Sequence, residues 1–132
     1  MIGRRATYVD SSAIVKLVNG EPETPALRRA IRGRHLASSA LARVEVPRAV
    51  QHLGPAGPSR ALVVLRGIEL VRINDRILAA AAEVEPVTLR SLDAIHLATA
   101  QLLGDGVRRL ITYDDRMADA AAGLGFTVLR PS

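Results

Sequence analysis

The chain has 132 residues and a mass of 14.1 kDa, which suits one domain spanning residues 1–132 and is too short for two ordinary ones. Its 48% hydrophobic and 23% charged residues are typical of a globular protein, and the absence of cysteine excludes a disulfide scaffold, a thiolate zinc site and a cysteine nucleophile. The net charge is +5, and all basic residues except Lys16 are arginines, which fits a nucleic-acid partner and equally fits an arginine-rich proteome.

Short strands and longer helices are predicted in alternation along the chain. The strand patterns are apolar or β-branched runs at 6–9, 35–37, 68–73, 110–113 and 126–129. The third run contains Glu69 and Arg72, so we expect it to be less buried than the others.

Helix patterns fill the intervals, and most begin at a residue that can cap a helix N-terminus. The caps are expected at Ser11 or Ser12, Thr24, Asn74 and Ser91, and helix ends at Gly33, Gly67 and Gly104. Further helices are expected over 39–53 and 115–122; Pro47 lies inside the first of these and predicts a kink or a late start. Residues 54–58 are predicted to form a turn between two helices.

This alternation predicts the α/β class, with a parallel sheet covered by helices on both faces. Asp10 directly follows the first predicted strand, and Asp114 directly follows the strand at 110–113. Both therefore fall at the carboxyl edge of the sheet, where open α/β folds bind ligands. Each also fits a second role, because aspartate just before a helix is a favoured N-cap.

Two further acids are candidates for the same site. Asp93 lies in a helix that is apolar almost all round, where a carboxylate must be paired, protonated or bound to a metal, or else complements the helix dipole from the first turn. Glu45 borders an apolar helix stripe, and an ion pair with Arg48 would explain it equally well. His96, one turn after Asp93, is expected to be a satisfied core residue rather than a partner of that carboxylate.

Four separated carboxylates are the ligands that a hard divalent cation such as Mg²⁺ or Mn²⁺ prefers. With such an ion, the cluster would serve metal-assisted hydrolysis of a phosphodiester, and a basic surround would hold a nucleic-acid backbone. Phosphoaspartyl enzymes also place an aspartate after the first strand, but they need a lysine late in the chain, and Lys16 is on the first helix.

Four blocks of the sequence, in order, resemble a PIN-domain ribonuclease, and more closely the VapC toxins of bacterial toxin–antitoxin pairs. The blocks are residues 8–13 with Asp10, 38–45 with Glu45, 89–100 with Asp93 and 111–117 with Asp114. The stretch Leu-Arg-Ser-Leu-Asp-Ala-Ile-His-Leu-Ala-Thr-Ala is close to the family's most recognisable segment. The match covers nearly the whole chain, and Pro47 is the one departure noticed.

The resemblance implies a three-layer α/β/α fold with a five-stranded parallel sheet. It implies Mg²⁺- or Mn²⁺-dependent endoribonuclease activity on RNA, inhibition by a cognate antitoxin, and a homodimer. It assigns the acidic site to Asp10, Glu45, Asp93 and Asp114, with Asp10 and Asp93 in direct contact with metal. Ser12, Thr112 and Asp115 fall where the family places supporting groups. The alternative is a non-catalytic RNA-binding or regulatory PIN-like domain, against which the four retained acids speak.

The sequence also bears on the cellular compartment. No apolar run approaches the length of a membrane span, and residues 6–9 are too short for the core of a signal peptide. We therefore expect a soluble, cytoplasmic protein that makes no contact with a membrane.

Overall fold

The computed structural model describes residues 5–132, and residues 1–4 lie outside the described range. A single parallel sheet runs through the middle of the molecule in the order β3-β2-β1-β4-β5. Its strands are β1 (Ala6–Val9), β2 (His35–Ser39), β3 (Glu69–Val71), β4 (Val107–Ile111) and β5 (Thr127–Leu129). The predicted α/β class and the five-stranded parallel sheet are confirmed.

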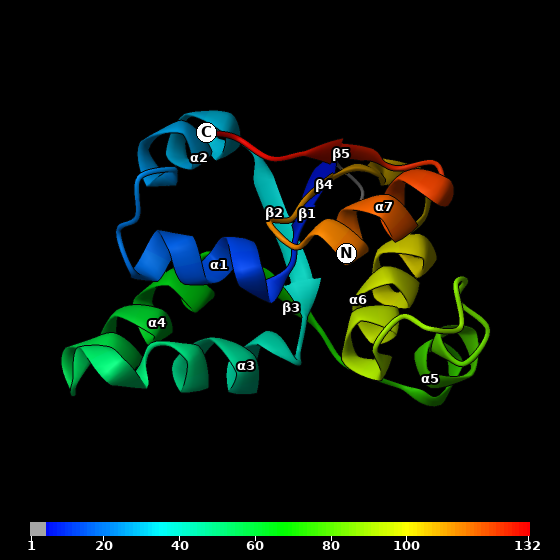
Figure 1. The fold of residues 1–132 in the computed structure, drawn as a ribbon, viewed down its shortest axis with the longest axis horizontal. Coiled ribbons are helices and arrows are strands. Elements are labelled where there is room, and N and C mark those ends of the chain that lie inside the picture. Colours follow the sequence, from blue (N-terminus) through cyan, green and yellow to red (C-terminus); the bar gives the residue numbers. More distant parts are fainter. Residues whose placement is uncertain (1–4) are drawn as a thin grey trace.

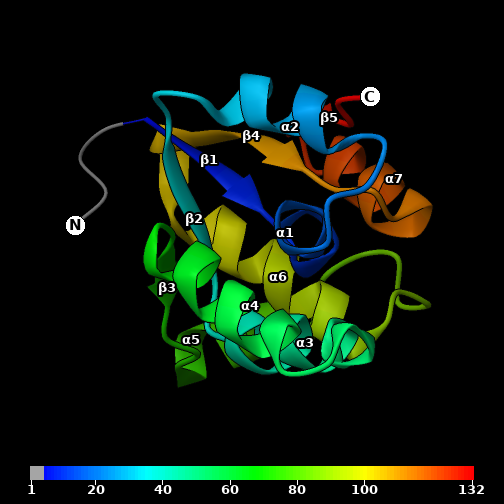
Figure 2. The ribbon, with the colours of Figure 1, turned by 90° about the vertical axis from the view of Figure 1, so that its left-hand side faces the viewer.

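Helices cover both faces of this sheet, as Figures 1 and 2 show. One side carries α1 (Ser11–Val18), α2 (Thr24–Ile31), α3 (Ala42–Ala49) and α4 (Ala56–Arg66). The other side carries α5 (Asp75–Ala81), α6 (Ser91–Leu102) and α7 (Asp115–Gly123). Within residues 5–132, no helix combines the length and the hydrophobicity that a membrane span requires.

The two helical layers have separate cores because successive strand residues point to opposite faces. Tyr8 and Leu110 are fully buried against α5, α6 and α7, whereas Val9 and Ile111 are fully buried among α1, α3 and α4. The central strands are therefore apolar on both faces, as expected for a covered parallel sheet.

The strand order places a topological switch point between β1 and β4. From β1 the chain adds β2 and then β3 on one side, and it returns to add β4 and β5 on the other. Val9 pairs in register with Ile111, so Asp10 and Thr112 emerge side by side where the two strands end. Open α/β sheets bind ligands at such a point.

Several predicted boundaries were wrong. The strand predicted at 110–113 runs over Val107–Ile111, so Asp114 follows it after two intervening residues rather than directly. The strand starts earlier because Val107 enters the core, although Arg108 and Arg109 hide the pattern in the sequence. The strand predicted at 35–37 continues through Ser39, whose register partner is Val71, and the one predicted at 68–73 is only three residues long.

The helix predicted over 39–53 is shorter than expected. It begins late, at Ala42, because the preceding residues belong to β2, and it ends at Ala49. Pro47 has no N–H for the carbonyl one turn earlier. Three residues beyond it, the Val50 N–H is shared between the carbonyls of Val46 and Pro47. A 3₁₀ turn over Gln51–Leu53 follows.

Three predicted helix caps were also wrong, and two helix ends were confirmed. Asp10, not Ser11 or Ser12, caps α1 by accepting a hydrogen bond from the Ala13 N–H at 3.0 Å. Thr24 and Ser91 are the first residues of their helices rather than caps. Asn74 caps α5 and Gly67 ends α4, as predicted.

Candidate active site

Asp10 lies at the centre of the candidate site and is only 4% exposed. Its Oδ1 accepts hydrogen bonds from the Ser12 hydroxyl at 2.6 Å and from the Ala13 N–H, and its Oδ2 accepts one from the Thr112 hydroxyl at 2.5 Å. Burial raises the pKa of Asp10, although the hydroxyls of Ser12 and Thr112 act in the opposite direction. Three hydrogen bonds therefore hold the carboxylate of Asp10 in place. A positive charge beside it would favour its ionised form.

The two hydroxyl residues predicted as supporting groups bind the loop after β4 as well as Asp10. Thr112 accepts a hydrogen bond from the Asp114 N–H at 3.1 Å, and Ser12 accepts one from the Tyr113 N–H at 3.0 Å. Each hydroxyl therefore donates to Asp10 and accepts from the backbone that leads into α7. This arrangement fixes the position of Asp114 relative to Asp10.

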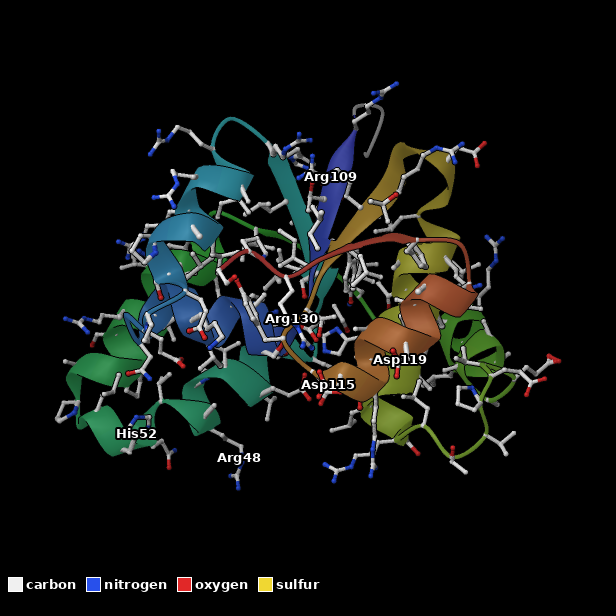
Figure 3. The ribbon with its side chains drawn as sticks, turned by 45° about the horizontal axis from the view of Figure 1, so that its top comes forward. Arg48, His52, Arg109, Asp115, Asp119 and Arg130 are labelled. Carbon is white, nitrogen blue, oxygen red and sulfur yellow. The ribbon has the colours of Figure 1, made fainter. Side chains whose placement is uncertain are left out.

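Glu45 enters the site from α3 and is half-buried. Its Oε1 accepts a hydrogen bond from the Ser11 hydroxyl at 2.7 Å and lies 2.8 Å from His96 Nε2. Burial raises the pKa of Glu45, but the hydrogen bonds from His96 and Ser11 outweigh that effect and leave the pKa below its usual value. The ion pair with Arg48 that the sequence allowed is not formed; Arg48 points away from the site in Figure 3.

Asp93 lies in the first turn of α6, half-buried, close to the other three acids. Burial raises its pKa first, and the negative charges of Asp114, Asp10 and Glu45 raise it further, whereas His96 lowers it. The buried helix predicted around Asp93 is confirmed, with five consecutive residues from His96 to Ala100 in the core. Asp93 itself faces the partly open edge of that helix.

Asp114 and Asp115 begin α7 and differ in surroundings. Asp114 caps the helix by accepting a hydrogen bond from the Met117 N–H at 2.9 Å, so its two suggested roles coincide. Asp115 has an 86% exposed side chain and pairs with Arg130 at 2.6 Å (Figure 3). Asp114 and Asp115 therefore both lie on the exposed rim of the site, whereas Asp10 is buried and Glu45 and Asp93 are half-buried.

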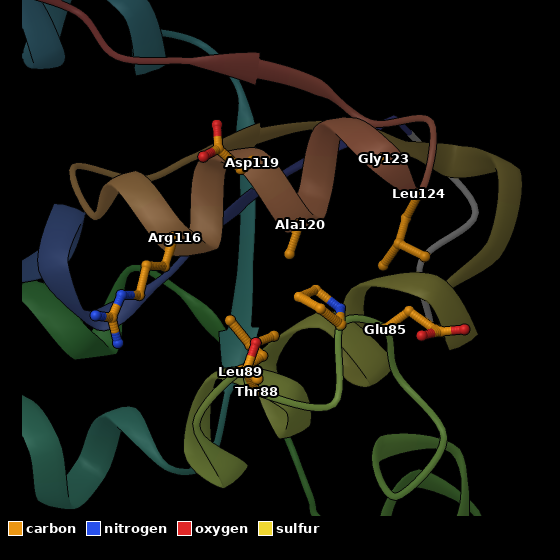
Figure 4. Close-up of a pocket in the computed structure, with 9 residues that line it drawn as sticks. Glu85, Thr88, Leu89, Arg116, Asp119, Ala120, Gly123 and Leu124 are labelled. Atoms are coloured by element: carbon orange, nitrogen blue, oxygen red, sulfur yellow. The ribbon is translucent and has the colours of Figure 1, made fainter.

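A small hollow of about 250 Å³ opens over this edge, lined by Arg90, Asp93, Asp114, Asp115 and Arg116. Three acids and two arginines thus line the same small hollow. A larger hollow of about 650 Å³ lies beside it, between α7 and the 85–89 segment, and Arg116 lines both. Figure 4 shows that Ala120, Leu124 and Leu89 face this second hollow, which contains none of the four predicted acids.

The four carboxylates fit a divalent cation in their chemistry. Within residues 5–132, no three histidine or acidic side chains converge tightly enough to form a ready-made metal cage. A hard cation such as Mg²⁺ nevertheless takes only a few protein carboxylates and keeps several waters. The mutual repulsion that raises the pKa of Asp93 is the kind of unfavourable charge that a bound cation relieves.

The sequence missed the hydrogen-bonded partners of Glu45. His96 is 2% exposed and is a satisfied core residue, as predicted, but its two nitrogens bind Tyr8 and Glu45. Ser11, predicted as a possible helix cap, also binds Glu45. These contacts join residues 34 or more positions apart, and no spacing in the sequence signals them.

Comparison with known proteins identifies the family. The PIN domain family matches residues 7–123. The chain is 53% identical over 128 residues to Ribonuclease VapC46 of Mycobacterium tuberculosis, covering 96% of this chain and 98% of that protein. It is 37% identical over 130 residues to Ribonuclease VapC47 of the same species, covering 94% and 96%.

Solved structures support the fold. The crystal structure of Mycobacterium tuberculosis VapC20, described as a Sarcin-Ricin loop cleaving toxin, has a TM-score of 0.72 at 15% identity and covers 95% of this chain and 99% of its own. A toxin–antitoxin complex from Klebsiella pneumoniae contains a chain with a TM-score of 0.71 at 22% identity, with coverage of 96% and 98%. Together with the sequence relatives, these matches show that the chain belongs to the PIN-domain family, among its VapC ribonucleases.

Proposed function

We propose that this protein, a single PIN domain over residues 1–132, is the toxin of a toxin–antitoxin pair and a divalent-metal-dependent endoribonuclease. The observation that carries the proposal is the hollow at the carboxyl edge of the sheet that Asp93 and Asp114 line together. The charges of Asp114, Asp10 and Glu45 also add, after burial, to the raised pKa of Asp93. Carboxylates gathered this closely at a switch point favour a cation and a ligand at that edge. The similarity to Ribonuclease VapC46 supports RNA as the substrate.

Asp10 and Asp93 are the residues that would hold the cation. Asp10 is kept in place by Ser12, Ala13 and Thr112, so little side-chain freedom is lost when an ion binds. PIN-domain ribonucleases generally use divalent metal ions, and we assign Mg²⁺, with Mn²⁺ as a substitute. When bound, the ion supplies positive charge to the reacting phosphodiester and eases the ionisation of water.

The other two acids are available for the attacking water. Asp114 uses its Oδ1 to cap α7, and Glu45 uses its Oε1 to bind Ser11 and His96, so each keeps a second oxygen for the reaction. Such a carboxylate orients the water that attacks phosphorus and accepts its proton. The exposed side chains of Arg90 and Arg116, which line the same hollow, would bind phosphates on either side of the cleaved bond.

The partners follow from the family. Among proteins of similar fold are a toxin–antitoxin complex from Klebsiella pneumoniae and VapBC2 from Rickettsia felis bound to a DNA fragment from their promoter. We propose that a cognate antitoxin inhibits this protein in the cytoplasm and that the protein forms a homodimer. Light scattering after size-exclusion chromatography, with and without the co-expressed antitoxin, tests both assemblies.

The direct test is cleavage of total RNA and structured RNA by purified, antitoxin-free protein with Mg²⁺, Mn²⁺ or EDTA. The Asp93→Asn variant should be folded and inactive. The control is Asp105→Asn, which removes an exposed carboxylate just beyond the other end of α6 and should leave cleavage unchanged.

Each outcome of this test is informative. Metal-dependent cleavage that disappears only in Asp93→Asn supports the proposed site. Wild-type rates in a folded Asp93→Asn protein contradict it. RNA binding without cleavage under every metal condition favours the alternative, a non-catalytic RNA-binding or regulatory PIN-like domain.

A further inference from the structure

A chain of three side chains connects the core of the sheet to the candidate site. The Tyr8 hydroxyl, on β1, lies 2.7 Å from Nδ1 of His96, on α6. His96 Nε2 in turn lies 2.8 Å from Oε1 of Glu45, on α3. Tyr8 and His96 are almost completely buried, and their rings meet edge to face, 80° apart, with centroids separated by 5.9 Å.

The ionisation state of Glu45 determines which nitrogen of His96 carries the shared proton. The pKa of Glu45 is lowered, so its carboxylate is ionised at neutral pH and only accepts hydrogen bonds. His96 Nε2 must therefore carry the hydrogen that is shared with Oε1. At the other end, the Tyr8 hydroxyl lies 2.7 Å from Nδ1 and holds that nitrogen in place.

The two carboxylate oxygens of Glu45 differ in the hydrogen bonds that they accept. Oε1 receives hydrogen bonds from both Ser11 and His96. Within residues 5–132, no hydrogen bond to Oε2 is formed. An oxygen that already has two donors is a weaker base than its free neighbour, so the two donors both fix the carboxylate plane and leave Oε2 as the more basic oxygen.

We infer that His96, held by Tyr8, is a positioning residue that acts through Glu45, and that Glu45 Oε2 is the oxygen that receives the proton of the attacking water. The inference rests on the proposed ribonuclease function. As the water oxygen bonds to phosphorus, its proton passes to Oε2. The bond between phosphorus and the departing ribose oxygen breaks, and that oxygen takes a proton from solvent.

A purely structural role for His96 makes a different prediction. If His96 only filled the core, its loss would act independently of Glu45 and would lower stability without changing the chemical step. If it positions Glu45, its loss matters only while Glu45 is present. A double-mutant cycle separates these cases, because residues that act as one unit are non-additive.

The experiment measures kcat and KM for RNA cleavage by the full chain with Mg²⁺. His96→Leu should lower kcat by about 10- to 100-fold with little change in KM, as expected when the partner of a working carboxylate is removed. His96→Gln should recover most of the loss, because its side-chain amide can donate to Oε1. Tyr8→Phe should give a smaller loss, because the ring stays and only the hydroxyl bond to Nδ1 is removed.

Thr99→Val is the matched control. Thr99 is fully buried on the same helix, and its hydroxyl donates to the Ile95 carbonyl rather than toward the site. This variant should lose stability but keep the wild-type kcat. Thermal unfolding of every variant distinguishes loss of fold from loss of chemistry.

In a Glu45→Ala background, His96→Leu should cause no additional loss of kcat. A full additional loss in that background, or wild-type kcat in a folded His96→Leu protein, overturns the inference. If His96→Leu does not fold, the comparison of His96→Gln and Tyr8→Phe with Thr99→Val decides in the same way. If the wild-type protein itself fails to cleave RNA, the proposed function fails, and ¹⁵N NMR of His96 still tests the proton: an unprotonated Nε2 contradicts the hydrogen-bond chain.

Discussion

The Thr112 hydroxyl donates a hydrogen bond to Asp10 Oδ2 across the seam between β4 and β1, with 2.5 Å between two oxygens whose residues are 102 positions apart. The register of the two strands produces this contact, because Val9 and Ile111 are paired and the next residues emerge together. The same hydroxyl accepts the Asp114 N–H. A single threonine therefore fixes the spacing between an acid that follows β1 and an acid that begins α7.

Replacing Thr112 with valine preserves its shape and removes this hydroxyl. Because the buried carboxylate of Asp10 loses a donor, we expect the free energy of unfolding to fall by about 1–3 kcal/mol. The pKa of Asp10, already raised by burial, should rise further. Urea denaturation measures the first effect. Thr127→Val, at an exposed position on β5, is the control, and equal losses in the two variants would contradict the assignment.

Asp10 has two roles that different substitutions separate. Asparagine at position 10 still accepts the Ala13 N–H and caps α1, so Asp10→Asn should unfold at a temperature near that of the wild type but should not cleave RNA. Alanine removes the cap as well and should cost about 1 kcal/mol in the free energy of unfolding. Calorimetry and cleavage assays on both variants check this. An active Asp10→Asn protein would remove Asp10 from the catalytic set.

The raised pKa of Asp93 predicts an unusual dependence of stability on pH. A carboxyl whose pKa is higher in the folded than in the unfolded protein destabilises the fold when ionised, and this penalty disappears as pH falls through the raised pKa. Asp93→Asn should therefore have a higher Tm than the wild type at pH 7. The difference should shrink as pH falls toward 3.8, the ordinary pKa of aspartate. Thermal melts across this range are the measurement.

The wild type and Asp93→Asn can also be compared in the presence of Mg²⁺. Mg²⁺ that binds the folded protein should raise its Tm, and the rise should grow with the logarithm of the Mg²⁺ concentration above the Kd. The wild type should respond more strongly than Asp93→Asn, because the variant lacks one of the two carboxylates assigned to the ion. Equal Mg²⁺ responses in the two proteins would indicate that the ion binds elsewhere.

Replacing two helical glycines, Gly57 and Gly123, with alanine should have opposite effects on the free energy of unfolding. A Cβ atom at Gly57 would lie 2.1 Å from the Val50 carbonyl oxygen, a backbone atom, so Gly57→Ala must separate α4 from the turn that follows α3. We expect a loss of about 1–3 kcal/mol in the free energy of unfolding. A Cβ atom at Gly123 meets nothing within 4 Å, so Gly123→Ala should be neutral or stabilise the helix by up to about 1 kcal/mol. Chemical denaturation of the pair checks both signs.

The parts of the fold that the sequence predicted best depend on local patterns. The first strand was predicted at its observed bounds because residues 6–9 enter the core without interruption. Asn74 was recognised as a cap because an asparagine between a strand pattern and a helix pattern favours that role. At positions 10–12, an aspartate and two serines can all cap a helix, and tertiary contacts decide: Asp10 caps α1, while Ser11 turns to Glu45 and Ser12 to Asp10.

The candidate site, too, could be predicted from the sequence only in part. Asp10 and the switch point were predictable, because an acid after the first strand of an α/β fold falls at the carboxyl edge of the sheet. The partnership between Glu45 and His96 was not, because it depends on how α3 and α6, on opposite sides of the sheet, reach past its edge. A boundary error in β4 did not displace the site, since Thr112 and Asp114 still emerge beside Asp10.

The strand order also determines how late in its own synthesis the chain can complete the candidate site. β1 leaves the ribosome early, but its neighbour β4 is made about a hundred residues later, and Asp10 lacks its Thr112 partner until then. A nascent chain therefore carries the first acid of the site without the seam that orders it. For an enzyme that we propose cuts RNA, the site can therefore be completed only after most of the chain has been made.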